Sequence, residues 1–118
     1  MSADDERKRG RELVARAIRW IGAHPESWRE LLSMCRWAQR KYGHVSRDVV
    51  YTECMRRRVD VTERPDICRE HDLWSALVRL ASRSTPGGLD FKRDPRCTVD
   101  KAYPTPEDLP ALPEGAVA

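Results

Sequence analysis

Apolar residues recur at helical spacing in two consecutive segments near the start of the chain. The first segment predicts an amphipathic helix over residues 5–22, because its apolar positions fall on one face: Leu13, Val14, Ala17, Ile18 and Ile21. The second predicts a helix over residues 25–42, with Pro25 in its first turn and Gly43 just past its end. Its expected inward face is Trp28, Leu31, Leu32, Cys35, Ala38 and Tyr42.

Two further helices are predicted in the middle of the chain. Ser46 is a good N-cap for a helix over residues 47–58, and Val45 before it can pack back as a hydrophobic staple. The apolar positions of this helix are Val49, Val50 and Cys54. Residues 59–69 have weak periodicity and contain Pro65, so we expect a loop. A fourth helix over residues 71–84 has the inward stripe Leu73, Trp74, Leu77, Val78 and Ala81.

The pattern changes after residues 85–88, a Thr-Pro-Gly-Gly turn. Apolar and charged residues alternate over 89–93 and again over 97–101, which is typical of half-buried strands. Between them Asp94, Pro95 and Arg96 have turn chemistry. We therefore expect a short β-hairpin over residues 89–101.

The last segment, residues 102–118, holds half of the prolines and no Lys or Arg. Proline removes backbone donors and disfavours helix in the residue before it, so we expect a disordered tail. The simplest interpretation is a solvated terminus. The alternative is an acidic peptide that uses Leu109 and Leu112 to dock on a partner or to shield a basic face.

The order of these elements indicates a mainly α fold. A chain of 118 residues supports one domain. Three helices followed by a hairpin are the order of a winged helix-turn-helix, here over residues 25–101, with an extra N-terminal helix in residues 1–24. The stretches that carry the likeness are Trp28–Tyr42, Gly43–Val49 and Leu73–Ala81. In these the chain resembles small winged helix-turn-helix proteins of actinobacterial phages and mobile elements.

The charge is unevenly distributed along the chain. It has 22 Lys and Arg against 19 Asp and Glu, a net charge of +3. Residues 102–118 contribute −3, which leaves +6 on residues 1–101. The first helix has a basic polar face, and its apolar stripe packs on the core of the domain or, alternatively, is exchanged across a homodimer interface.

The resemblance implies a DNA-binding protein, with helix 71–84 in the major groove and the hairpin as a wing on the backbone. With the apolar stripe inward, the outward positions of that helix are Ser75, Arg79, Ser82 and Arg83. The expected wing contacts are Lys92, Arg93 and Arg96, and the expected flanking phosphate contacts are Arg47 and Arg57. We therefore expect duplex DNA as the partner of a small phage or mobile-element transcriptional regulator. The alternative is a module that binds and inhibits a host protein.

Other classes of function have weaker support. The mean hydropathy is −0.71 and no apolar run follows Arg7–Arg9, so we expect no membrane span, no secretory signal and a cytoplasmic location. Four cysteines in that compartment are expected to be thiols. Cys68 and His71 have zinc-ligand spacing and could combine with Cys54 or Cys97, but a second close pair is missing. Without a nucleophile–base pair or a phosphate loop, we expect neither an enzyme nor a cofactor.

Overall fold

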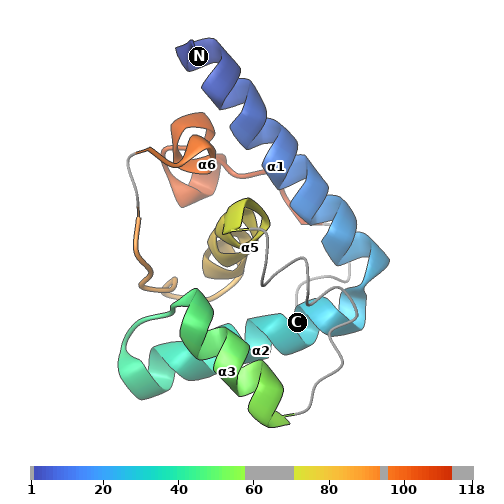
Figure 1. Cartoon of the computed structure of the whole chain (residues 1–118), viewed down its shortest axis with the longest axis vertical. Coiled ribbons are helices and arrows are strands. Elements are labelled where there is room, and N and C mark those ends of the chain that lie inside the picture. The colour runs from blue at the N-terminus through green and yellow to red at the C-terminus, as the bar shows by residue number, and fades with distance from the viewer. Residues whose placement is uncertain (1, 58–70, 94–95, 113–118) are drawn as a thin grey trace.

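The computed structural model describes residues 2–57, 71–93 and 96–112, and within these ranges the protein is mainly helical (Figure 1). The long helices are α1 (Ala3–Ala23), α2 (Pro25–Tyr42), α3 (Arg47–Arg57) and α5 (His71–Arg83). A short helix α6 (Thr98–Ala102) and a 3₁₀ turn η1 (Pro106–Asp108) follow. The four helices predicted from apolar spacing are thus confirmed. None of the helices in these ranges is long and apolar enough to cross a bilayer.

Side-chain caps and a glycine define the helix ends. The backbone N–H of Asp5 donates to Ser2 Oγ, which begins α1 two residues earlier than the sequence predicts. Gly43 ends α2 with a φ of 75°, a left-handed conformation that favours glycine, and its N–H donates to the Gln39 carbonyl. Ser46 caps α3, since its Oγ accepts from the Val49 N–H at 3.2 Å. The predicted cap and stop residues of α2 and α3 are therefore confirmed.

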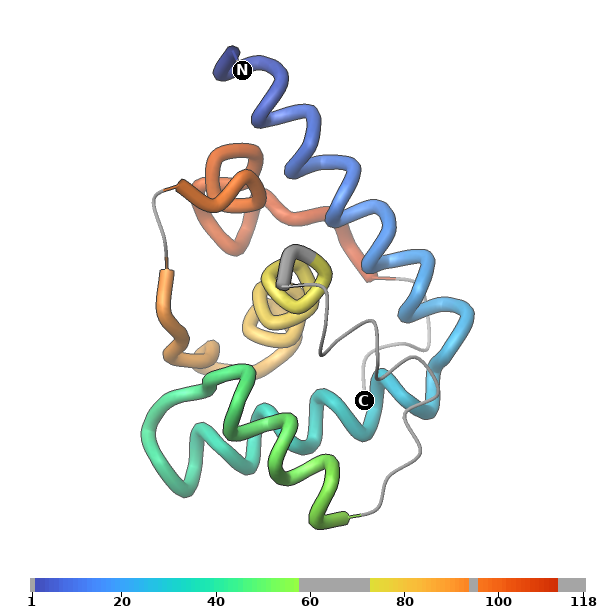
Figure 2. Tube along the Cα trace, viewed as in Figure 1, coloured from blue at the N-terminus to red at the C-terminus, as the bar shows by residue number. Residues whose placement is uncertain are grey.

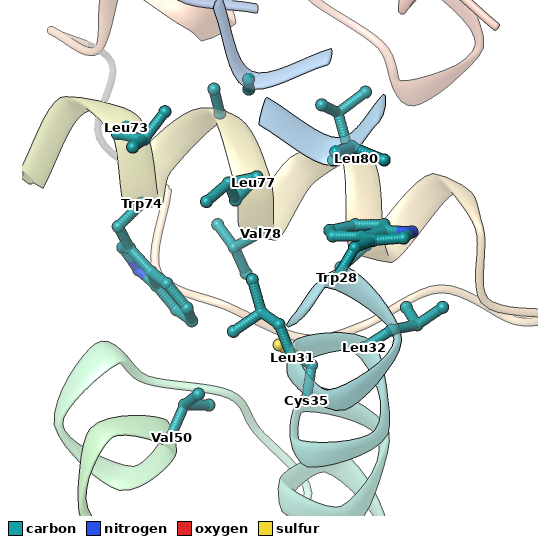
Figure 3. Close-up of a cluster of buried hydrophobic side chains, with 14 of the residues drawn as sticks. Trp28, Leu31, Leu32, Cys35, Val50, Leu73, Trp74, Leu77, Val78 and Leu80 are labelled. Carbon is teal, nitrogen blue, oxygen red and sulfur yellow. The ribbon is translucent and has the colours of Figure 1, made fainter. Parts of the chain in front are cut away.

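Helix α5 runs through the centre of the molecule, with α1, α2 and α6 around it (Figure 2). Every residue from Leu73 to Ser82 is buried. On one side of α5, Trp74 and Val78 point toward Leu31 of α2 and Val50 of α3, whereas Leu73 and Leu80 lie on the other side of the helix (Figure 3). The opposite side of α5 is also covered, by α1, α6 and the segment around η1. A central helix buried all round was not expected from its amphipathic pattern.

The prediction of a second hairpin strand over residues 97–101 is wrong, because residues 98–102 form helix α6. Val99 is fully buried in the core, so one apolar side chain in this segment points inward, as the alternation predicts. The two residues after Val99, however, form ion pairs with other helices. Asp100 pairs with Arg79 on α5, and Lys101 pairs with Glu6 on α1 at 2.6 Å. Over five residues these long-range contacts outweigh a weak local strand preference.

The first expected strand is extended but pairs with a different segment. Residue Phe91 forms a single parallel bridge with Val45, and the Val45 N–H donates to the Asp90 carbonyl at 2.7 Å. Apart from this bridge, the described ranges contain no β-structure, so the predicted wing is not formed there. The buried Val45, expected to staple α3, instead joins the start of α3 to the segment that follows α5.

The expected disorder of the tail is also not found in residues 102–112. Leu109 is buried, Leu112 packs against the core, and η1 contacts α5. The prolines of this segment are compatible with the observed conformation, because an extended segment makes few backbone hydrogen bonds and so needs few N–H donors. The tail therefore covers the C-terminal half of α5, which is the intramolecular form of the docking peptide considered above.

A close helix contact explains the single glycine within the first half of α1. Gly10 is buried against the start of α6, and a Cβ at this position would lie 2.0 Å from the Thr98 carbonyl oxygen and 2.9 Å from Ala102 Cβ. The glycine thus allows α1 and α6 to approach at backbone distance.

We expect Gly10→Ala to destabilise the protein by about 1–3 kcal/mol, because α6 must move away from α1. Helix propensity alone would give the opposite sign, a gain of about 1 kcal/mol. The comparison variant is Ala15→Gly at an exposed position of the same helix, which measures propensity without the contact. Urea denaturation gives both values, and a more stable Gly10→Ala variant would contradict the described packing.

Candidate functional site: a basic groove

The helix expected to read DNA bases does not present the predicted residues to solvent. Ser75, Arg79 and Ser82 are only 8%, 7% and 6% exposed. The prediction that they point outward is wrong, because it assumed that only one side of α5 is covered. Of the four predicted residues on this helix, Arg83 alone is exposed.

Arg79 is part of an internal ion pair. Its Nε and Nη2 donate to the two carboxylate oxygens of Asp100, each at 2.6 Å, and its Nη1 donates to the Ser75 carbonyl at 2.8 Å. The guanidinium also lies 5.0 Å from the ring centroid of Phe91. This bidentate geometry joins α5 to α6, so Arg79 has a structural role.

Ser82 and Arg83 hold the segments that follow α5. Ser82 Oγ accepts from the Leu89 N–H at 2.9 Å, which fixes the end of the turn at residues 85–88. Arg83 Nη1 donates to the Pro110 carbonyl at 2.5 Å and so fastens the tail. Both side chains stabilise chain reversals rather than facing a DNA groove.

Other basic residues gather at a groove beside α5. This groove has a volume of about 610 Å³ and lies where α1, the start of α3, α5 and α6 meet. Arg9, Arg47, Lys92 and Arg96 line it, and we call it the basic groove. Asp48 is the one carboxylate among the described residues that line it. The groove also contains Arg79, whose charge is paired with Asp100.

Three separate segments supply the four cations. Arg9 projects from α1, and Arg47 is the first residue of α3, where the N-terminal end of the helix adds a positive partial charge. The bridge between Val45 and Phe91 brings Lys92 beside the start of α3. Arg96 precedes α6. Residues distant in sequence are therefore collected by the tertiary structure.

The floor of the basic groove is mostly apolar, with the buried Ser75 and Arg79 as its polar residues. Leu13, Val45, Val78 and Val99 line it together with the half-buried ring of Phe91. Hydroxyls from Ser46 and Thr98 also line the groove. The site can thus offer charge, hydrogen-bond donors and apolar contact to the same partner.

Five of the nine predicted site residues line the basic groove: Arg47, Ser75, Arg79, Lys92 and Arg96. Of these, Ser75 and Arg79 are buried, and the charge of Arg79 is paired with Asp100. Arg93 lies next to it, with its guanidinium 5.2 Å from the Phe91 ring centroid. Arg9 is a groove residue that the prediction omitted. The basic run of residues 7–11 is its only sequence signal, because its direction depends on how α1 packs against α6.

Arg57 lies elsewhere and serves the fold. Its Nε donates to Glu53 Oε1 at 2.8 Å. Arg56 makes three bonds to the same carboxylate, two through its Nε at 3.2 and 3.0 Å and one through its Nη2 at 2.5 Å. The Glu53 side chain is only 3% exposed. The hydrogen bonds from Arg56 and then Arg57 lower the pKa of Glu53 from 4.5 to about 2, against the opposing effect of burial.

The described ranges contain no cluster of three or more His, Cys, Asp or Glu residues that could hold a metal ion. Cys68, part of the alternative zinc set, lies outside these ranges. Cys35 and Cys54 are buried, and burial raises the pKa of the Cys35 thiol to about 12. Cys35 is therefore a protonated core residue at neutral pH.

Comparison with known proteins gives no match, whether with family models, curated proteins or solved structures. The chemistry of the basic groove is therefore the basis for assigning a function.

We expect Arg79→Ala to lower the free energy of unfolding by about 3 kcal/mol, because it leaves the Asp100 carboxylate without its partner in a partly buried site. A double variant, Arg79→Met with Asp100→Leu, should recover most of this loss since neither charge remains. Thermal and urea denaturation measure both effects. Equal stability of Arg79→Ala and the wild type would contradict a structural role for Arg79.

The lowered pKa of Glu53 predicts an acid-sensitive contribution to stability. Above pH 4.5 the carboxylate is charged in the folded and unfolded states, and its contribution is complete. As the pH falls from 4.5 toward 2, the unfolded state binds the proton first and this contribution is lost.

Glu53→Gln should therefore be less stable than the wild type at neutral pH and flatten the loss of stability in this acid range. Thermal melting followed by circular dichroism at a series of pH values measures the slope. Glu30→Gln, at an exposed position of α2, removes the same charge without affecting the arginine pair. Identical slopes for the Glu53→Gln variant and wild type would show that this carboxylate does not titrate as described.

Proposed function

We propose that the protein binds duplex DNA through the sugar–phosphate backbone, using the basic groove. The observation that carries the proposal is the convergence of Arg9, Arg47 and two further cations from three segments on one groove that includes a single carboxylate among its described residues. Arg and Lys side chains, hydroxyls and helix N-termini are the groups that proteins use to hold phosphate oxygens. All three are present around this groove.

The proposed contact differs from that of a winged helix-turn-helix protein. There the recognition helix enters the major groove, whereas α5 is enclosed by other elements of its own chain. Contacts to phosphate position a protein on DNA but do not read the base sequence. The proposed binding is therefore largely independent of sequence, and the role of transcriptional regulator would need a further source of specificity.

The apolar floor favours a second candidate, an acidic segment of another protein. The half-buried Leu13 and Phe91 could contact apolar side chains of such a segment while the basic residues at the groove pair with its carboxylates. This corresponds to the host-protein module considered from the sequence. Four cations with one carboxylate favour the more highly charged partner, so DNA is the first candidate.

The test is a titration of mixed-sequence duplex DNA at 50 and 200 mM salt. Four phosphate contacts predict a slope of log affinity against log salt of about −3.6, or roughly a 100-fold loss over this range. A variant with Arg47→Ala, Lys92→Ala and Arg96→Ala should reduce the slope to about −1, because one contact remains. Fluorescence anisotropy measures both slopes, and circular dichroism checks that the variant folds.

The matched control is Arg11→Ala with Arg29→Ala and Arg40→Ala, three exposed cations outside the basic groove. It removes the same net charge and should retain most of the wild-type slope. Equal losses in both triple variants would assign binding to the overall charge instead of the groove. If the wild type does not bind DNA at 50 mM salt, the DNA proposal is wrong and the acidic protein segment becomes the first candidate.

A further inference from the structure

A second surface, formed by α2 and α3, exposes large apolar side chains. Tyr42, Tyr51 and Met55 are 49%, 43% and 50% exposed, and they are the exposed large hydrophobic residues of the described ranges. All three belong to the C-terminal end of α2 or to α3. Single exposed apolar residues are common on proteins, but a cluster on neighbouring helices marks a contact surface.

The exposed side of α3 has a regular pattern. Its inward residues are Val50, Glu53 and Cys54, whereas Asp48, Tyr51, Thr52, Met55 and Arg56 are exposed. Positions 48, 51, 52 and 55 follow the i, i+3, i+4, i+7 spacing of one helix face. We call these five exposed residues the α3 face. It has an acid near its start, a base near its end and two large apolar side chains between.

A groove lies beside the α3 face. Its volume is about 450 Å³. Its apolar lining is Trp37, Tyr42 and Val49, and its polar lining is Lys41, Asp48, Thr52, Glu53 and Arg56. The Trp37 and Tyr42 rings meet edge to face at 5.8 Å between centroids, so the groove has an ordered aromatic wall. Lys41 Nζ lies 5.1 Å from the Trp37 ring centroid and gives this wall a positive rim. The α3 face thus carries an apolar ridge, Tyr51 and Met55, beside a groove that has an aromatic wall and several charged side chains.

We propose that this face binds a second copy of the same chain, with the two α3 helices packed antiparallel about a twofold axis near Thr52. Such a contact is self-complementary, because both copies present the same residues about the axis. Tyr51 and Met55 of each copy would pack against Tyr51 and Met55 of the other. This inference is independent of the proposed DNA binding.

The charges of α3 support this occupant and orientation. Residues 48 and 56 are equally distant from residue 52, so antiparallel packing places Asp48 of one copy opposite Arg56 of the other, twice per dimer. Parallel packing would instead bring like charges together. Arg56 is 69% exposed, and Arg57 still holds Glu53 when Arg56 turns to the second copy. A helix of 11 residues is about 16 Å long, so the interface is small and the dimer reversible.

Sedimentation velocity from low micromolar concentration to about 1 mM tests the proposal, and we expect concentration-dependent dimers. Tyr51→Glu and Met55→Glu should each raise the dissociation constant about tenfold or more. Both positions are exposed, so the variants should keep the wild-type melting temperature. Ala15→Glu, at an exposed position of α1, introduces the same charge elsewhere and should leave the dissociation constant unchanged.

A cysteine placed at the proposed axis tests the orientation. In a background with Cys68→Ser and Cys97→Ser, Thr52→Cys should form a covalent dimer under mild oxidation, because a residue near a twofold axis lies close to its counterpart. Ala15→Cys, on α1, should form it far more slowly. The proposal is overturned if the wild type stays monomeric at 1 mM and the two cysteine variants cross-link at equal rates. The α3 face would then be open to a different protein.

Discussion

The ion pair between Arg79 and Asp100 is the interaction on which the arrangement of this molecule depends. Both guanidinium–carboxylate bonds are 2.6 Å long, and they join the central helix α5 to the short helix α6. A helix of five residues has little stability of its own, so α6 forms because its side chains have partners on α5 and α1. The glycine at position 10 permits the same arrangement from the other side, since it lets α1 contact the backbone of α6.

Because α5 is enclosed, the basic side chains of the described residues fall into two sets with different places in the fold. Arg57, Arg79 and Arg83 have protein partners, so they contribute to the fold. Arg9, Arg47, Lys92 and Arg96 line the basic groove. The net charge of +3 therefore describes neither surface well. The proposal of a polyanionic partner rests on how the basic residues are distributed in space. The exposed apolar ridge on α3 is a separate surface with different chemistry.

Much of the helical structure could be predicted because its signals are local. Apolar spacing, the Ser46 cap and Gly43 act within one or two turns, and the four long helices follow from them. The candidate site was harder to predict. Arg47, Lys92 and Arg96 line the basic groove, but Arg9 was not among the predicted site residues and Arg79, expected to face solvent, is buried against Asp100. An arginine on a polar helix face has the same sequence pattern whether it meets solvent or an internal carboxylate.

The sequence by itself therefore determined the positions of the four long helices and most of their buried apolar residues, because backbone hydrogen bonding and side-chain periodicity act over a few residues. Tyr42 is an exception, since it was expected to face inward and is 49% exposed. Only the tertiary structure decided that residues 98–102 are helical and that Leu109 returns to the core. It also decided that α5 is covered on both sides. These outcomes depend on partners 21 or more residues away, such as Asp100 for Arg79 and Glu6 for Lys101, and no local pattern contains that information.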